Sequence, residues 1–327
     1  MHIRTCFPGR LIICVGLLLC ASTAWPQSQP YPNRPVHLIV PFPPGGAVDP
    51  LARMFSQKLD EVWKQPVLIE NKPGAGTIIG TDALAKSPPD GYTVMLGAAS
   101  FTVNAAMNSK LPYDPVKDIA PISLVFKVPQ MLVVNPQVPV NSVKELIDYL
   151  KSHPGKLNYA SSGSGAAAHL AGELFKSMTK TDMVHIPFKG AGPAITDVLA
   201  GRSQMIFATA LSVKAYIDAN RLRPLGVTTL KRMDTMPNLP TIAESGVPGF
   251  EASTWHGLVA VAGTPRAVTT RLNAEVNAIL KDSQVSKFLE SQGAIIEGGT
   301  AEKFAEHIKA EIPKWAKVIK DSGARAD

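Results

Sequence analysis

Four short segments share a residue pattern that could bind an anion. In each, an apolar run leads into a loop rich in glycine, proline or serine, and an amphipathic helix follows; the loops span residues 42–49, 71–77, 161–165 and 189–194. The first turn of a helix presents unpaired N–H groups and the positive end of the helix dipole, and glycine lets a ligand approach the backbone. Tight turns between strands and helices have a similar composition, so one such loop is weak evidence. Four together favour a binding site for an anionic ligand.

Other motifs for catalysis or metal binding are incomplete. Gly74, Gly76 and Gly80 resemble a dinucleotide fingerprint, but their spacing departs from it and no acidic residue ends a clear following strand. Ser164 is followed by glycine, yet Ser162 stands where a nucleophile elbow needs glycine, so we interpret Ser164 as a capping or ligand-binding serine. The histidines do not recur at metal-ligand spacing. We therefore expect no catalytic residue, no metal and no cofactor.

The first 24 residues have the layout of a secretory signal. Two arginines accompany an apolar run at 11–21 that is too short to span a bilayer, and Ser22 and Ala24 are the small residues expected before a cut after Ala24. All three cysteines lie in this segment, at positions 6, 14 and 20. We therefore expect residues 1–24 to be a signal peptide, and the exported protein to contain no disulfide, thiolate metal ligand or cysteine nucleophile.

Length and composition exclude several classes of protein. The chain has 327 residues, of which 45% are hydrophobic and 18% charged, which is enough apolar material for two lobes and too little charge for a disordered chain. The formal net charge is +7, from 33 basic and 26 acidic residues. Because no block of five or six basic residues occurs, we expect no nucleic-acid binding.

Short β-branched runs alternate with segments of helical periodicity, which predicts an α/β fold. Strands are expected at 36–40, 67–70 and 92–96, with a helix at about 77–86 before the third. The helix after the first strand should have Asp49 as its N-cap, followed by Pro50. Its apolar face should be buried, and it is formed by Leu51, Phe55, Leu59 and Val62.

The middle of the chain repeats the pattern. Pro129 divides two apolar runs, which predicts two separate strands, at 122–126 and 131–134. Ser142 and Glu145 form a capping box for a helix that ends before His153. Helices should also run through residue 178 and over 194–200. Further strands are expected at 157–160, 183–188, 204–208 and 222–227.

The last part of the chain predicts one strand, at 257–261, and two amphipathic helices. The first of these helices carries apolar residues from Val268 to Ile279 at helical spacing. The final helix should bury Phe304, Ile308, Ile312, Trp315 and Ile319. Trp63 and Trp315 are expected in the core, whereas Trp255, beside His256, is expected to line a lobe boundary.

The order of the elements predicts two lobes. Both chain ends, residues 25–125 and 229–327, should form the first lobe, and residues 126–228 an inserted second lobe. The chain would then cross between the lobes twice, near residues 126 and 228. Two crossings imply a hinge and a central ligand cleft.

These motifs resemble one known group, the Bug-type receptors of tripartite tricarboxylate transporters, which are periplasmic solute-binding proteins. The similarity extends in order over essentially all of the chain after the leader. The matching stretches are Arg34-Pro35-Val36, residues 41–46 with Asp49, residues 71–76, Asp90-Gly91-Tyr92-Thr93, residues 111–115, residues 162–165 with His169-Leu170, residues 187–190, residues 240–246 and Gly249-Phe250-Glu251.

The resemblance implies a periplasmic-binding-protein type II fold whose two lobes close on a small carboxylate. It also implies which residues hold the ligand: the first strand-loop-helix segment, partly through ordered waters, together with groups from the middle lobe and a hydroxyl after the third strand. Carried over to this sequence, the ligand-binding residues are Phe42, Pro44, Gly45, Gly46, Asp49, Gly76, Ser100, Ser162, Gly163, Ser164, His169, Lys189, Gly190 and Ala208.

Two positions depart from the family pattern. Members often carry acids on the strand at 204–208, where this chain has Gln204 and Ala208. Because a buried ammonium group needs a partner, we expect a carboxylate without an amino group, such as a dicarboxylate, tricarboxylate or aromatic acid. Gly76 is followed by Thr77, where family members usually have a second glycine. The threonine side chain should leave a ligand less room to approach the backbone at this loop.

The sequence thus predicts a monomeric receptor that captures a small organic acid in the periplasm and delivers it to a membrane permease. Two alternatives remain open at this point. One is a periplasmic enzyme that uses His169 and a cleft serine on a similar acid. The other is a sensor that reports its ligand state to a membrane histidine kinase.

Overall fold

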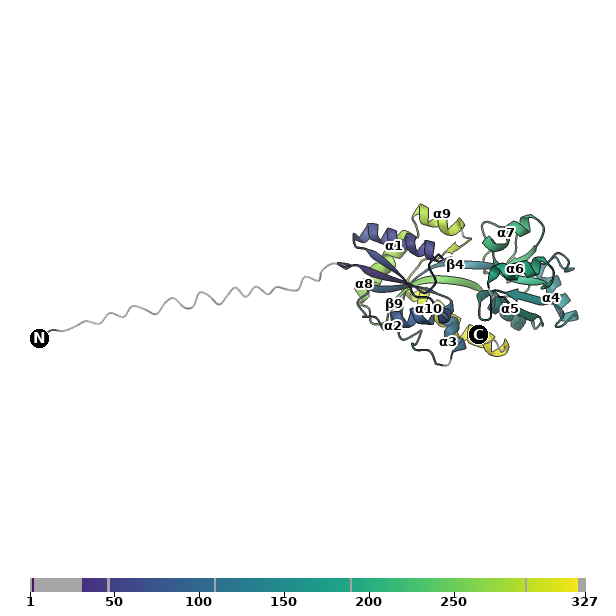
Figure 1. Cartoon of the computed structure of the whole chain (residues 1–327), viewed down its shortest axis with the longest axis horizontal. Helices are drawn as coiled ribbons and strands as arrows, with labels where there is room; N and C mark the ends of the chain where they lie inside the picture. Colours follow the sequence, from purple (N-terminus) through teal and green to yellow (C-terminus); the bar gives the residue numbers. More distant parts are fainter. Residues whose placement is uncertain are drawn as a thin grey trace.

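The computed structural model describes residues 2, 31–45, 48–108, 110–188, 190–291 and 293–322. The predicted α/β fold is confirmed: helices flank a sheet that extends through two lobes (Figure 1). In this view α1, α2, α8 and α9 lie in one lobe and α4 to α7 in the other. The expected signal peptide falls almost entirely outside the described residues. No helix in the described part of the chain combines the length and apolar character needed to cross a membrane.

The first lobe is built on parallel strands. The three predicted strands are confirmed: β1 (Val36–Val40) lies between β2 (Val67–Asn71) and β3 (Thr93–Ala98), and it pairs in parallel with both. Leu38 packs in a core with α1 and α8, whereas Ile39 packs in a second core with α2 and α10. Strands covered on both faces read as continuous apolar runs, which explains the sequence of β1. The helices of this lobe are α1 (Asp49–Trp63), α2 (Ile78–Ala85), α3 (Ser100–Met107), α8 (Arg266–Ile279) and α9 (Ser283–Ser291).

One long strand links the two lobes. β4 (Ile119–Val134) pairs with β9 (Ser253–Val261) along its first part and with β7 (Met205–Thr209) and β8 (Arg223–Val227) along its second. The prediction of two strands divided by Pro129 is therefore wrong. Pro129 lacks an N–H, yet it is still the partner of the first residue of β9. From the next residue onward, β4 pairs with β7 instead. The proline falls where the pairing partner changes.

The second lobe repeats the strand-helix pattern. β5 (Asn158–Ser161) pairs in parallel with β6 (Val184–Pro187) and β7. The predicted N-cap of α4 is confirmed, because the Glu145 N–H donates to the Ser142 hydroxyl at 3.1 Å. The Glu145 carboxylate reaches back to the Asn141 N–H, at 2.8 Å, one residue before the expected one. The helices are α4 (Val143–Ser152), α5 (Ala167–Thr179), α6 (Ala191–Leu199) and α7 (Ala210–Asp218).

Several sequence-based details differ from the structure. Helices α3, α7 and α9 were not expected, and Ser100, expected in a loop, begins α3. Asp49 lies inside α1, where the cap position belongs to Val48. Val62 is half exposed and Trp63 takes the buried place, in edge contact with Tyr31. Two short elements complete the first lobe, the 3₁₀ turn η1 (Ala75–Thr77) and β10 (Ile295–Ile296), which pairs with β4.

The C-terminal helix α10 (Ala301–Ser322) belongs to both lobes. Its first half places Phe304 in the core of the first lobe, and its second half places Trp315 in the core of the second, beside α5. The segment before β9 also packs in the second lobe, through Val247 and Phe250. Core packing thus favours the start of β9 over residue 228 for the second crossing. The lobe boundaries themselves stay a prediction.

Gly257 lets α10 press directly on β9. A Cβ atom at this position would lie 2.3 Å from the Phe304 ring and 2.9 Å from the Ser123 carbonyl oxygen. We expect Gly257→Ala to destabilise the protein by about 1–3 kcal/mol, as overpacked core substitutions do. The matched control is Gly192→Ala in α6, where a Cβ meets nothing within 4 Å and alanine favours the helix. Urea unfolding of both variants measures the difference, and equal stabilities would contradict the packing described.

Candidate ligand-binding site

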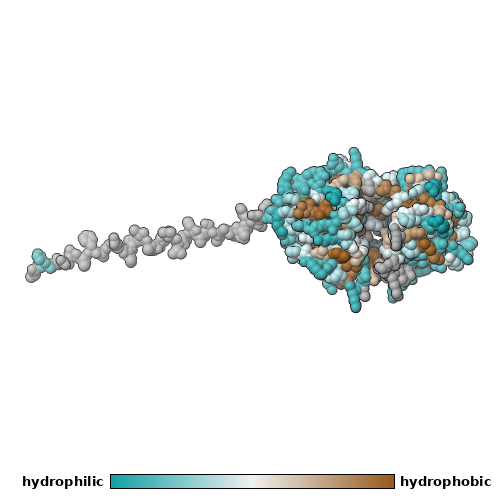
Figure 2. All heavy atoms as spheres, in the orientation of Figure 1, coloured by the Kyte–Doolittle hydropathy of each residue, from teal (hydrophilic) through white to brown (hydrophobic). Residues whose placement is uncertain are grey.

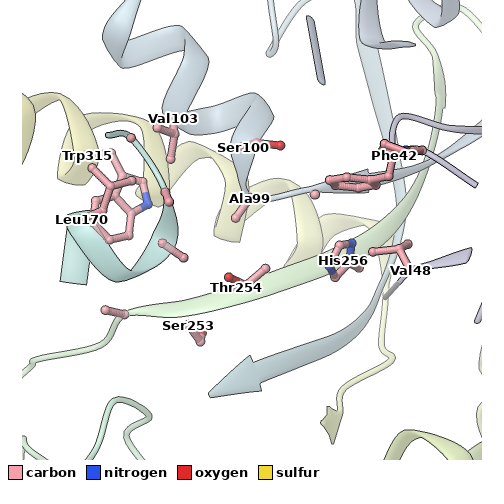
Figure 3. Close-up of a pocket in the computed structure, with 16 residues that line it drawn as sticks. Phe42, Val48, Ala99, Ser100, Val103, Leu170, Ser253, Thr254, His256 and Trp315 are labelled. Carbon is pink, nitrogen blue, oxygen red and sulfur yellow. The ribbon is translucent and has the colours of Figure 1, made fainter. Parts of the chain in front are cut away.

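A cavity of about 370 Å³ opens between the lobes. Its wall is contributed by the loop after β1, the start of α3, the start of α5, strand β9 and helix α10. In Figure 2 the surface is indented between the two lobes. Figure 3 shows Phe42, Val48 and His256 on one side of the cavity and Leu170 and Trp315 on the other. Five segments that are distant in sequence therefore meet at one place.

Two helix N-termini reach this cavity. Ala99 and Ser100 line it at the start of α3, and Ala166 and Ala167 line it at the start of α5. Neither helix has a side-chain cap. The first N–H groups of a helix have no partner within the helix, and the dipole makes this end positive. The cavity is thus suited to a small anion.

The rest of the wall is neutral. Among the described lining residues, the side chains that carry polar groups are the hydroxyls of Ser100, Ser253 and Thr254, the imidazole of His256 and the indole of Trp315. No described lining residue is an aspartate, glutamate, lysine or arginine. The described residues also contain no group of three histidine, cysteine, aspartate or glutamate side chains that could hold a metal ion.

His256 is the one titratable side chain in the described wall, and it is buried. Its ring stacks on Phe126 at 4.8 Å between centroids and meets the Phe42 ring at its edge, at 5.9 Å. Burial lowers the pKa of His256 to about 4, and a hydrogen bond with the Gly97 backbone offsets part of this shift. The imidazole is therefore neutral at neutral pH.

A smaller cavity, of about 120 Å³, continues the apolar surface. It shares Val48 and His256 with the larger one. Apart from Thr209, its other described walls are apolar side chains of both lobes, among them Phe126, Leu211 and Phe288. His256 and Val48 thus line both cavities.

Trp315 is held in a fixed orientation at the cavity wall. Its indole N–H donates to the buried Glu311 carboxylate at 2.7 Å, and the Trp255 N–H approaches the same oxygen at 3.4 Å. Burial acts to raise the pKa of Glu311, but the charge and hydrogen bond of Lys314 lower it below its usual value. The carboxylate is thus ionised and anchors the indole.

Of the predicted ligand-binding residues, Phe42 and Ser100 line the cavity. Pro44 is exposed beside Pro43, which does line it. Gly46 and Lys189 lie outside the described residues. The others lie around the cavity rather than in its wall.

Asp49 organises the loop after β1. Its carboxylate accepts hydrogen bonds from the Gly45 N–H at 3.1 Å, from Arg53 at 2.9 Å and from Asn71 at 3.3 Å. The bond from Gly45 is the main cause of the lowered pKa of Asp49. The side chain is therefore ionised and engaged in shaping the loop that carries Phe42.

His169 and the predicted residues at 162–164 support the loop that leads into α5. The His169 Nδ1 atom accepts from the Gly165 N–H at 2.9 Å, and its ring stacks on His185 at 3.9 Å. The Gly190 N–H donates to the Ser162 carbonyl at 3.2 Å, which ties this loop to the loop before α6. Gly163 and Ser164 complete the turn before Gly165, which lines the cavity. His169 thus supports the loop through this hydrogen bond and does not line the cavity.

Gly76 and Ala208 are further from the cavity. The Gly76 carbonyl accepts from the Asn104 side chain at 2.7 Å, and the neighbouring Thr77 hydroxyl lies 2.9 Å from that of Ser100. Ala208 is buried in β7 opposite Met131 and packs in the core of the second lobe. The departure from the family pattern at Ala208 therefore falls on a core position in this structure.

Sequence reasoning missed several wall residues. Strand alternation could have found the pair Thr254 and His256, which face the cavity while Trp255 between them is fully buried. Trp255 packs edge-on against Phe101 and Phe304, so its expected place at a lobe boundary is wrong. Trp315 is buried as expected and also lines the cavity.

A two-lobed α/β fold with a cavity between the lobes is typical of a protein that binds a small molecule. The chain belongs to the tripartite tricarboxylate transporter receptor family, because residues 51–324 match the family described as "Tripartite tricarboxylate transporter family receptor". Protein BugT of Bordetella pertussis strain Tohama I is 37% identical over 320 residues, which cover 97% of this chain and 98% of BugT. The Bug-type resemblance is thereby confirmed.

Solved structures agree with this assignment. The R. palustris protein Rpa4515, solved with adipate, superposes with a TM-score of 0.74 at 38% identity and covers 90% of this chain and 99% of its own. MatC of Rhodopseudomonas palustris, solved with bound malate, has a TM-score of 0.71 at 30% identity and covers 88% of this chain and 100% of its own.

The buried neutral imidazole predicts a specific pH dependence. The folded pKa of His256, about 4, lies below the ordinary value of 6.5, so the unfolded chain takes up the proton first as the pH falls. The folded protein should lose up to about 3 kcal/mol of stability between pH 6.5 and 4 from this group alone. We expect His256→Gln to remove that part of the loss.

Chemical denaturation of both proteins at several pH values measures this effect. The control is His153→Gln, whose side chain is exposed and stacks on Tyr149. Parallel stability profiles for the wild type and His256→Gln would show that His256 is not a buried neutral histidine.

Proposed function

We propose that this protein is a periplasmic receptor that captures a small organic carboxylate and delivers it to the membrane permease of a tripartite tricarboxylate transporter. The observation that carries the proposal is the meeting of the first turns of α3 and α5 at one cavity between the lobes. Unpaired N–H groups and two positive helix ends suit a carboxylate. The relatives solved with adipate and malate support the same class of ligand.

The mechanism is a shift between open and closed forms. A ligand that contacts both lobes stabilises the closed form by its differential affinity for it. The cavity meets this requirement, since Phe42 and Ser100 belong to the first lobe and Ala167 and Leu170 to the second. β4 and α10 continue through both lobes, and the chain also crosses at the start of β9, so these segments would bend on closure.

The site residues of this proposal combine the wall with its supports. The ligand contacts would come from Phe42, the start of α3, the start of α5 and β9. Asp49, Gly76 and His169 would hold the contacting loops in place, through the hydrogen bonds described above. The signal peptide at residues 1–24 would direct the chain to the periplasm, where we expect it to act as a monomer.

The ligand should lack an amino group. No described wall residue carries a carboxylate, so a buried ammonium group would have no charged partner. The proposal also excludes an enzyme built on His169, because that imidazole accepts a hydrogen bond from the loop and lies beneath it.

Thermal unfolding with a panel of acetate, hexanoate, adipate, malate, citrate, benzoate, aspartate and glutamate tests the proposal. A ligand that binds only the folded protein raises its stability with concentration, by about 2.7 kcal/mol at 100 times Kd. We expect at least one carboxylate, and neither amino acid, to raise the melting temperature. Failure of every carboxylate would contradict the proposal.

A cavity-filling variant tests the place of binding. Ala167 is exposed and lines the cavity, so Ala167→Trp should keep the fold and weaken binding of the active carboxylate at least tenfold. The matched control is Ala267→Trp, an exposed alanine in the first turn of α8 that lines neither cavity. Unchanged affinity of Ala167→Trp for the carboxylate would show that the ligand binds outside this cavity.

A further inference from the structure

The charge balance of the cavity limits what it can bind. Its described wall contains no cationic side chain, and its positive potential comes from the first turns of α3 and α5. Each helix end acts as roughly half an elementary charge, so two ends together match about one carboxylate. The cavity is therefore electrically matched to a monoanion.

No described wall residue offers a charged partner to a second carboxylate. A second carboxylate deep in the cavity would lose its hydration without gaining a charged partner in the described wall.

The rest of the cavity wall is suited to an apolar body, by which we mean the part of the ligand other than its carboxylate. Figure 3 shows Phe42 and His256 facing Trp315 and Leu170 across the cavity. Val103 adds a further apolar side chain to the wall. The Trp315 indole is fixed by its bond to Glu311 at 2.7 Å, and the His256 ring by its stacking on Phe126. Rigid aromatic walls favour a planar or compact apolar group by offset and edge contacts.

We propose that the ligand is a monocarboxylate with an apolar body about the size of one aromatic ring. Its carboxylate meets the first turns of α3 and α5, and its body lies between Phe42 with His256 and Trp315 with Leu170. This inference rests on the proposed function and narrows its substrate class. It sets this chain apart from the relatives solved with adipate and malate, which are both dicarboxylates.

Calorimetric titration of the exported form with four acids tests the inference. Hexanoate and adipate share six carbons and differ by one carboxylate, so their comparison isolates the second charge. Acetate and benzoate differ in the apolar body. We expect hexanoate to bind at least tenfold more tightly than adipate, and benzoate at least tenfold more tightly than acetate.

The outcomes separate this inference from the proposed function. Adipate binding as tightly as hexanoate, or more tightly, overturns the inference and leaves the carboxylate receptor intact. Benzoate binding no better than acetate also overturns it. Failure of all four acids, together with malate and citrate, overturns both proposals.

A charge introduced into the wall gives a second test. Thr254 is partly exposed and lines the cavity, so Thr254→Lys supplies a partner for a second carboxylate. We expect the ratio of adipate to hexanoate affinity to rise at least tenfold in Thr254→Lys. The ratio should stay unchanged in the control Thr270→Lys, an exposed position on α8. An unchanged ratio in a folded Thr254→Lys protein overturns the proposed position of the ligand's apolar part. If the variant does not fold, the comparison of hexanoate with adipate in the wild-type protein still tests the inference.

Discussion

The antiparallel pairing of β4 with β9 is the constraint on which the structure depends. These two strands lie next to each other from Ile119 to Pro129 of β4, and β4 then pairs with β7 and β8, which joins the sheets of both lobes. Gly257 in β9 lets α10 pack against this pair, so that the helix continues from one core into the other. The relative position of the lobes therefore follows from one strand pair and one helix.

The same pair builds the candidate site. β9 pairs with β3 so that His256 lies opposite Ala98, directly before the start of α3. The loop after β1 reaches the other side of His256 through Phe42, and α10 brings Trp315 from the opposite wall. The start of α5 completes the cavity from the second lobe. A neutral, largely apolar space with two helix ends is the consequence, and it favours an anion with little charge.

Much of this could be predicted from local sequence. The strand β1 and the cap at Ser142 were found because each depends on neighbouring residues. The continuity of β4 through Pro129 could not be found, since it depends on which strand pairs there. Phe42 and Ser100, which line the cavity, were expected at the site from the family resemblance, whereas Trp315 and Leu170 come into the wall only through packing between the lobes. His169 was expected to contact the ligand. In the structure it lies in α5 and accepts a hydrogen bond from the Gly165 N–H, so it supports the loop before that helix.

The central claim is that backbone N–H groups at the starts of α3 and α5 hold the ligand's carboxylate. A crystal structure of the protein with benzoate tests it most directly. The account predicts the carboxylate oxygens within about 3 Å of backbone nitrogens in the first turns of both helices, with the ring beside Trp315. A carboxylate bound by one lobe alone, or a ring outside the cavity, would contradict it.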